Sequence, residues 1–271
     1  MIRKETSPRA LTLTGVTFSY PQTNALAGID LTVPAGSYLG IVGSNGSGKT
    51  TLAFLIAGIL KPSSGTIDTH GMRIGLVLSN PANQIVSLVV EEDIAFGPEN
   101  MGLPSLEIKS RIGNALAEVH GEHLRYALTS KLSGGELSKV AYAGQLAMDV
   151  DILVLDEGTV MLDPASRKTL LKTIRELNAD QGKTVIHISH RLDDLESAKA
   201  VLVLQNGVIT HRSSGVFSLV KEYAQAGIPG IEAGPQLLYR SFLNEHAIDD
   251  GDLEKATGIL AELIIKNNPF L

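Results

Sequence analysis

One stretch of eight residues constrains this chain more than any other: Gly43-Ser44-Asn45-Gly46-Ser47-Gly48-Lys49-Thr50, which Thr51 follows. The spacing G-x-x-x-x-G-K-T is that of a P-loop, in which glycines let the backbone turn tightly and bring successive N–H groups against phosphate oxygens. The apolar runs 38–42 and 52–57 predict a strand before the loop and a helix after it. The helix N-terminus adds a positive end, Lys49 can reach the β- and γ-phosphates of a nucleotide, and the Thr50 hydroxyl can ligate Mg²⁺. The alternative is a Gly/Ser-rich connection without a ligand, which the complete match in a strand-loop-helix context disfavours.

Composition limits the remaining possibilities. The 271 residues, 44% of them hydrophobic, are ample for a packed core, and a formal net charge of -6 argues against a nucleic-acid partner. The chain has no cysteine, which excludes disulfides and thiolate metal sites. Its first residues lack the apolar core of a signal peptide, and no run approaches the roughly 18 apolar residues of a membrane span, so we expect any membrane role to use a partner.

The order of apolar patterns predicts an α/β fold with a helical insertion. We expect strands at 11–20, 29–33, 66–68, 73–78, 151–157 and 183–189, a helix at 164–180, and a hairpin of 201–204 with 208–210 that turns at Asn206-Gly207. Residues 81–148 are mostly helical in pattern and predict an inserted helical subdomain. We therefore divide the chain into a nucleotide-binding domain, 9–226, and a C-terminal helical extension, 227–271, which we expect to serve dimerisation.

A second nucleotide motif is expected about a hundred residues after Lys49, where the apolar strand 152–155 ends in Asp156-Glu157. Asp156 would hold Mg²⁺ directly or through water, and Glu157 would polarise the attacking water. The alternative is a pair of exposed carboxylates at a strand end, which the P-loop in the same chain disfavours. The expected cofactors are therefore ATP and Mg²⁺.

A third motif is Leu132-Ser133-Gly134-Gly135-Glu136, which opens a predicted helix. Ser133 and Glu136 have the spacing of a capping box, so an ordinary helix start is one interpretation. The two glycines leave the backbone bare at a helix N-terminus and favour a second anion contact. Together with the P-loop, the motif resembles the signature of the ATP-binding-cassette (ABC) family, over nearly the whole chain.

The ABC resemblance implies roles for three further residues. Tyr20 is similar to the aromatic residue that stacks on adenine, Asp163 to the D-loop aspartate, and His190 to the switch histidine that senses the γ-phosphate. Taken singly, each has a plainer interpretation: a packing residue at a strand end, a cap for the helix at Pro164, and a surface residue after a strand. His120 and His123 lie three residues apart, on what could be one helix, and we expect them to be solvated rather than metal ligands.

A narrower resemblance, to the ATPase components of energy-coupling-factor (ECF) transporters, rests on Asn80-Pro81-Ala82-Asn83-Gln84, on the run 91–100 and on Met161-Leu162-Asp163-Pro164. It implies an ATP-hydrolysing subunit at the cytoplasmic face of the cell membrane that powers import of a vitamin or a transition-metal ion. The implied partners are a second ABC ATPase subunit, a transmembrane coupling subunit and a substrate-binding membrane subunit. The acidic residues Glu91, Glu92 and Asp93 would receive basic coupling helices, or would be a solvated first helical turn favoured by the helix dipole.

The chain departs from the ECF pattern at three positions: Ser79 replaces a glutamine, Glu136 replaces the glutamine that ends the signature, and Gly158 replaces proline, serine or alanine. Serine is about 2 to 3 Å shorter than glutamine, so it would not reach Mg²⁺ and water in the same way. Two other functions therefore stay open: a degenerate regulator that binds ATP with little hydrolysis, which Ser79 favours, and a soluble ABC protein acting on DNA or translation. Proteins of the second class generally have two cassettes or long coiled-coil insertions, and this chain has neither.

Overall fold

A computed structural model describes residues 8–219, and the predicted extension 227–271 lies outside these residues. The strands are β1 (Arg9–Tyr20), β2 (Thr23–Pro34), β3 (Tyr38–Val42), β4 (Ser64–Asp68), β5 (Ile74–Val77), β6 (Ile152–Asp156), β7 (Thr184–Ile188), β8 (Ala200–Gln205) and β9 (Val208–Ser213). The α-helices are α1 (Lys49–Ile56), α2 (Val90–Asn100), α3 (Ser105–Glu118), α4 (Gly134–Ala147) and α5 (Pro164–Ala179). Short 3₁₀ helices are η1 (Pro81–Asn83), η2 (Glu122–Leu124), η3 (Thr129–Lys131) and η4 (Leu192–Leu195).

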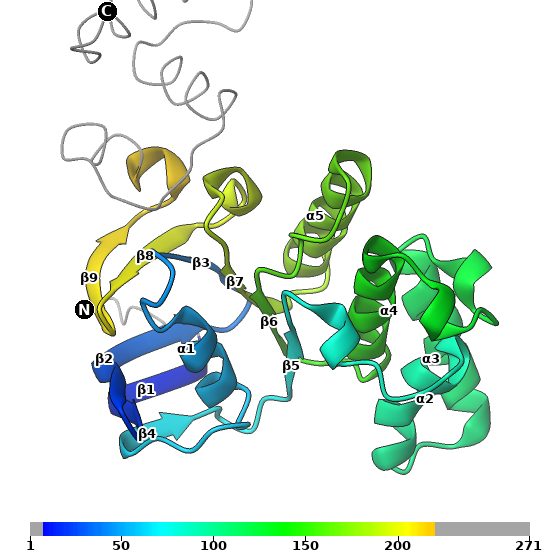
Figure 1. The fold of residues 1–271 in the computed structure, drawn as a ribbon, viewed down its shortest axis with the longest axis horizontal. Coiled ribbons are helices and arrows are strands. Elements are labelled where there is room, and N and C mark those ends of the chain that lie inside the picture. The colour runs from blue at the N-terminus through cyan, green and yellow to red at the C-terminus, as the bar shows by residue number, and fades with distance from the viewer. Residues whose placement is uncertain (1–7, 220–271) are drawn as a thin grey trace, which may run out of the picture.

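A three-stranded antiparallel sheet, in the order β2-β1-β4, covers one side of the P-loop region (Figure 1). The predicted second strand, 29–33, was too short, because β2 begins at Thr23 and pairs with β1 along its length, from Tyr20 opposite Thr23 to Arg9 opposite Pro34. Only Pro21 and Gln22 separate the two strands, so they form a tight hairpin. The hairpin brings Tyr20, at the end of β1, to the turn.

A six-stranded sheet, in the order β5-β6-β7-β3-β8-β9, carries the motifs. Its strands are parallel except for β9, and β3, β6 and β7 are buried at every position, as expected for a sheet covered on both faces. Because β6, β7 and β3 are neighbours, the residues that follow them meet at one edge of the sheet. Chain crossovers thus place the P-loop, Asp156-Glu157 and His190 together although they are far apart in the sequence.

Helices α2, α3 and α4, all within the stretch 81–148 that the sequence predicts to be mostly helical, form a group beyond the β5 side of this sheet, which we call the helical subdomain (Figure 1). One hydrophobic cluster joins these helices to the sheet and α5, and a second fills the space between the two sheets around α1. His120 and His123 do not share a helix, since α3 ends at Glu118, His120 has φ 51°, and His123 belongs to η2. Among residues 8–219, no helix is both long and apolar enough to cross a membrane.

Candidate nucleotide-binding and catalytic site

The P-loop joins β3 to α1 and is packed so closely that two of its glycines are required. A Cβ on Gly43 would lie 2.1 Å from the Leu204 carbonyl oxygen, and Gly48, with φ 101°, would place one 2.5 Å from the Ala25 carbonyl oxygen. The hairpin turn after β8 supports the loop, because the Gly207 N–H donates to the Ser47 carbonyl at 3.1 Å. The predicted turn at Asn206-Gly207 therefore also fixes the P-loop.

Lys49 is buried and lies folded against this loop. Its Nζ donates to the carbonyl oxygens of Gly43 at 2.8 Å and Ser44 at 2.9 Å. Desolvation by burial lowers the Lys49 pKa, while the negative charges of Glu157 and Asp156 act in the opposite direction. The residues fit a phosphate ligand: the cation is desolvated, a Cβ on Gly46 would meet nothing within 4 Å, and the buried Ser47 hydroxyl has no hydrogen-bond partner among the described residues.

The predicted Mg²⁺ ligands lie together. Asp156 ends β6 and is buried, and the Thr50 side chain, in the first turn of α1, hydrogen-bonds to its carboxylate. Desolvation by burial raises the Asp156 pKa, with the charge of Glu157 adding to this, while the Thr50 hydrogen bond and Lys49 oppose it. Hydroxyl and carboxylate oxygens are the ligands that Mg²⁺ prefers, so this pair fits the ion.

Glu157 and His190 also meet, as a catalytic pair requires. The His190 Nδ1 lies 3.3 Å from the Glu157 Oε2, and the Glu157 N–H donates to the Ile188 carbonyl at 3.0 Å. Glu157 has φ 54°, a left-handed conformation that is uncommon for a residue with a side chain and is often found at functional sites. The backbone turn at Glu157 thus directs its carboxylate toward His190.

Tyr20 lies at the side of the P-loop helix. The residue is 43% exposed, its hydroxyl is 3.4 Å from the Thr51 Oγ1, and its ring packs edge-on against Phe18 with centroids 5.0 Å apart. An exposed aromatic face next to the loop agrees with the adenine-stacking role that the resemblance implies.

The signature residues occupy the start of α4, in the helical subdomain. The capping box is present: the Ser133 Oγ accepts from the Glu136 N–H, and the Glu136 carboxylate accepts from the Ser133 N–H at 2.8 Å. Ser133 and Gly134 are exposed, and a Cβ on Gly134 or Gly135 would be 3.6 Å from Met161 or Leu162. The signature therefore packs beside the loop that leads to α5 of its own chain.

Asp163 caps α5, which is the plainer of its two interpretations. Its Oδ1 accepts from the backbone N–H groups of Ala165 and Ser166, both at 3.0 Å. The hydrogen bond with the Ser166 side chain, followed by these backbone hydrogen bonds, lowers the Asp163 pKa. The carboxylate is exposed at the same time, so the capping role leaves it accessible to a partner.

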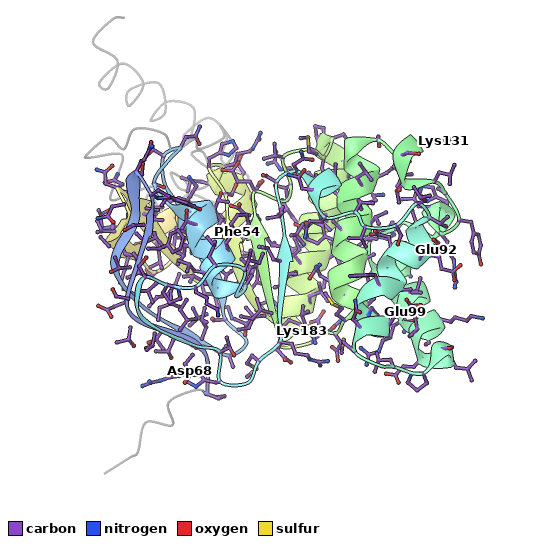
Figure 2. All side chains as sticks on the ribbon, turned by 60° about the horizontal axis from the view of Figure 1, so that its bottom comes forward. Phe54, Asp68, Glu92, Glu99, Lys131 and Lys183 are labelled. Atoms are coloured by element: carbon purple, nitrogen blue, oxygen red, sulfur yellow. The ribbon has the colours of Figure 1, made fainter. Side chains whose placement is uncertain are left out.

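The acidic run at the start of α2 is only partly available to a partner. Asp93 accepts from the N–H groups of Val86 and Ser87, at 2.7 and 3.0 Å, and Glu91 pairs with Arg125 at 2.5 Å. Glu92 points outward from the helical subdomain (Figure 2). The expectation that basic groups of a partner bind here stays a prediction, and it fits Glu92 better than Glu91 or Asp93, which have partners within the chain.

Gln84, the last residue of the run 80–84, has a structural role that its sequence position did not predict. Its Oε1 accepts from the Leu78 N–H and its Nε2 donates to the Leu76 carbonyl, both at 2.7 Å. Gln84 thereby holds the end of β5, immediately before Ser79. Its position in an Asn-Pro turn was the available signal, but only the fold shows which backbone it binds.

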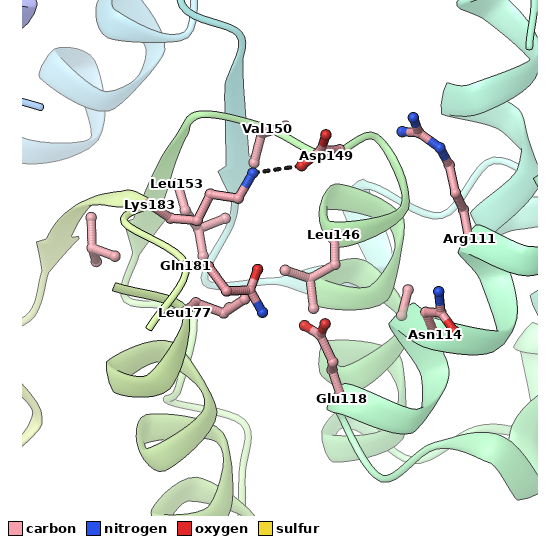
Figure 3. A pocket seen from close by; sticks show the side chains of 12 residues that line it. Arg111, Asn114, Glu118, Leu146, Asp149, Val150, Leu153, Leu177, Gln181 and Lys183 are labelled. Carbon is pink, nitrogen blue, oxygen red and sulfur yellow. Dashed lines mark hydrogen bonds and ion pairs between the residues drawn. The ribbon is translucent and has the colours of Figure 1, made fainter. Parts of the chain in front are cut away.

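A cavity of about 280 Å³ lies elsewhere, between α3, α4, α5 and the starts of β6 and β7 (Figure 3). Its polar lining includes Arg111, Glu118 and the ion pair of Lys183 with Asp149, whose atoms are 2.5 Å apart. Lys183 and Val150 precede their strands, so this cavity lies at the opposite edge of the sheet from the P-loop.

Comparisons with known proteins give a consistent result. The ABC transporter domain family matches residues 26–160. The chain is 42% identical to the energy-coupling factor transporter ATP-binding protein EcfA of Methanosarcina acetivorans, over 73% of this chain and 77% of that protein. It is 40% identical to the cobalt import ATP-binding protein CbiO of Syntrophus aciditrophicus, over 79% and 81% of the two chains. Among solved structures, cbiO1 of Clostridium perfringens, described as part of the ABC transporter complex cbiONQ, matches with a TM-score of 0.72 and 31% identity, over 88% of this chain and 96% of that one.

Proposed function

Since this chain belongs to the ABC transporter family of ATPases, and within it to the ECF ATP-binding proteins, we propose that it hydrolyses ATP to power import of a vitamin or a transition-metal ion through membrane partners. The observation that carries the proposal is the meeting of Lys49, the Thr50–Asp156 pair and the Glu157–His190 pair at one edge of the sheet. These groups are what phosphoryl transfer to water needs: a phosphate clamp, metal ligands and a base held in place.

Each residue of the site has its own role in ATP hydrolysis. Lys49 exchanges the Gly43 and Ser44 carbonyl oxygens for phosphate oxygens of the substrate ATP, and the P-loop N–H groups hold the same phosphates. Glu157 accepts a hydrogen bond from the attacking water and orients it, while His190 holds the Glu157 carboxylate and contacts the γ-phosphate. Thr50 and Asp156 would hold Mg²⁺, which when bound neutralises charge on the phosphate oxygens.

A second ABC ATPase subunit completes the site in this proposal. Ser133, Gly134 and Gly135 form a helix start, with Ser133 and Gly134 exposed, and would contact the nucleotide held by the partner's P-loop. Asp163, exposed next to them, would lie at the same interface. ATP would close the two subunits head to tail, and hydrolysis would reopen them.

The membrane partner is proposed to dock on the helical subdomain, at a surface that we call the 86–128 patch. It contains the exposed apolar residues Val86, Leu88, Tyr126 and Leu128, with Glu92 nearby on α2. The two segments are joined, because Val89 pairs with Leu128 and the Thr129 N–H donates to the Leu88 carbonyl at 2.9 Å. An apolar patch with an acidic neighbour suits an amphipathic segment that carries a basic residue.

Two substitutions test the catalytic proposal with different expected outcomes. Lys49→Ala should weaken ATP binding, because it removes a phosphate clamp, and Glu157→Gln should block turnover while ATP still binds and holds the dimer closed. ATPase assays with nucleotide titration and size analysis distinguish the two. Wild-type turnover in Glu157→Gln would exclude Glu157 as the base.

The second candidate, a regulator that binds ATP with little hydrolysis, is favoured by Ser79 alone. In that case the wild-type chain and Glu157→Gln should have the same low turnover, both alone and with the partner subunits.

Affinity purification from detergent-solubilised membranes tests the partner proposal. Glu92→Lys together with Leu88→Asp should release the membrane protein without changing ATP binding. Glu99→Lys is the control for the Glu92→Lys substitution, since it makes the same change of side chain at the other end of α2 (Figure 2). Retention of the membrane protein by the double variant, at physiological salt, would exclude the 86–128 patch as the docking site.

A further inference from the structure

The side chain of Asp194, in η4, is a buried carboxylate that the proposed mechanism does not use. Its side chain is 1% exposed, and its Oδ1 lies 2.7 Å from the Arg167 Nε. Its other oxygen, Oδ2, accepts from the Thr159 hydroxyl at 2.7 Å and from the Ser189 hydroxyl at 3.3 Å. One carboxylate therefore binds three segments of the chain.

Each of these three segments carries a site residue. Thr159 is two residues after Glu157, and the Val160 N–H donates to the Glu157 carbonyl at 3.1 Å. Ser189 immediately precedes His190, and its hydroxyl also accepts from the Arg191 N–H at 3.0 Å. The Asp194 carboxylate thus holds the backbone on both sides of the Glu157–His190 pair.

The third contact reaches the D-loop. Arg167 lies in the first turns of α5, and its N–H donates to the carbonyl of Asp163, the residue that caps this helix, at 2.9 Å. The loop between Glu157 and Asp163 is therefore held at its start through Thr159 and at its end through Arg167, by the same carboxylate.

Stability alone is a weak reason for this arrangement. Taking an Asp and an Arg out of water costs about as much as their attraction returns, and apolar side chains of similar volume commonly serve a core equally well. Hydrogen bonds to a charged group are directional and short, so what they add is fixed geometry. Thr159 and Ser189 are also buried, which places these two hydroxyl donors where water does not compete, and the Arg167 side chain is 18% exposed.

We propose that Asp194 is a positioning residue for ATP hydrolysis, whose carboxylate sets the placement of Glu157 relative to His190 and of the Asp163 loop through Thr159, Ser189 and Arg167. The inference rests on the proposed function, because it assigns a role to Asp194 only if Glu157 and His190 act on ATP. Asp194 itself touches neither substrate nor metal in this scheme. Its effect is therefore on kcat rather than on nucleotide affinity.

The sharpest test is at Thr159, where a matched pair of variants separates the hydrogen bond from the packing. Thr159→Val keeps the shape but removes the donor, and Thr159→Ser keeps the donor but removes a methyl group. For the full chain we expect Thr159→Val to lower kcat about tenfold to a hundredfold, since displacements near 1 Å cost rates of that order, with KM for ATP and the affinity for a fluorescent ATP analogue within about twofold. Thr159→Ser should keep kcat within about twofold of wild type.

Asp194→Asn provides the second measurement. It should lower kcat by a similar factor, and the double variant with Thr159→Val should lose no more than the larger single loss, because both changes break the same contact. Two results would overturn the positioning role. One is a loss of kcat in the double variant equal to the product of the two single losses, and the other is an equal kcat for Thr159→Val, Thr159→Ser and wild type. No turnover in the wild-type chain with its partner subunits would instead overturn the proposed function, and the positioning role with it.

Discussion

Ser79 is the residue at which we expect the length of one side chain to affect the rate of hydrolysis. It follows Leu78, whose N–H is held by Gln84, at the end of β5 and next to β6, which carries Asp156. We expect Ser79→Gln to raise ATPase activity of the assembled complex several-fold, about 1 kcal/mol of barrier, because glutamine is long enough to hold Mg²⁺ and the attacking water. Ser79→Asn, an amide with shorter reach, is the control and should change activity little.

If the two variants and the wild type hydrolyse ATP at the same rate, serine is simply tolerated here. In a heterodimer whose partner retains glutamine, the partner's catalytic-glutamate variant should lose more activity than Glu157→Gln. Equal losses would show that the two sites are equivalent.

Gly158, in the turn after β6, is packed against Tyr142 of α4. A Cβ at this position would lie 2.9 Å from the Tyr142 hydroxyl oxygen and 3.1 Å from the Val77 Cγ1, and Tyr142 is buried in α4. We expect Gly158→Ala to lower the free energy of unfolding by about 1 to 3 kcal/mol through overpacking next to Glu157, and to slow turnover. The measurement is chemical denaturation together with an ATPase assay.

Tyr142→Phe should relieve much of that loss. Its hydroxyl has no hydrogen-bond partner among residues 8–219, so phenylalanine alone should be close to neutral, and combined with Gly158→Ala it removes the nearest contact. Additive losses in the double variant would show that the two residues do not share the space.

Among the elements, the start of α4 depends on its capping box. Glu136 accepts hydrogen bonds from both the N–H and the hydroxyl of Ser133, which lower its pKa, and its carboxylate is thus bound back toward the cap. We expect Glu136→Ala to cost about 1 kcal/mol of unfolding free energy, by the usual size of cap effects. Glu136→Gln, the residue of the ECF pattern, keeps an acceptor and should cost less than half of that in the same denaturation experiment.

At the scale of the molecule, a buried pair in the central sheet makes stability depend on pH. His187, in β7, is fully buried, and its Nδ1 hydrogen-bonds to the Tyr38 hydroxyl at 2.9 Å. Desolvation by burial lowers the His187 pKa from 6.5 to about 4. The negative charge of Asp194 acts to raise this pKa, and the positive charge of Arg167 acts to lower it. The unfolded chain therefore binds a proton at higher pH than the folded chain does. The neutral histidine's contribution is present above pH 6.5 and is lost as the pH falls through about 4.

This shift predicts a loss of about 2 kcal/mol of unfolding free energy from His187 alone between about pH 7 and pH 5. Urea denaturation at several pH values measures it. His187→Asn, which keeps a polar atom for Tyr38 but does not titrate, should be less stable at pH 7 and have a flatter pH dependence. An equal slope in the two proteins would show that protonation of His187 does not contribute.

Local pattern was sufficient to predict much of this protein. The P-loop spacing, the strands predicted at 151–157 and 183–189, the cap at Asp163 and the turn at Asn206-Gly207 all follow from rules that act within a few residues, and the structure has each of them, with the strands at Ile152–Asp156 and Thr184–Ile188. The α/β class and the helical subdomain followed from the order of those patterns. The extent of β2 was missed because pairing with β1, rather than its own residues, sets its length.

Only the tertiary structure decided which distant residues meet. The Glu157–His190 pair, the support of the P-loop by Gly207, the contact of Gly158 with Tyr142 and the three segments bound by Asp194 all join parts of the chain that no local rule relates. The same holds for Glu91 and Asp93 of α2, whose partners lie outside that helix. The physical reason is that propensity and periodicity act over a few residues, whereas side-chain partners are set by how strands cross over and pack, and those crossovers depend on the whole core at once.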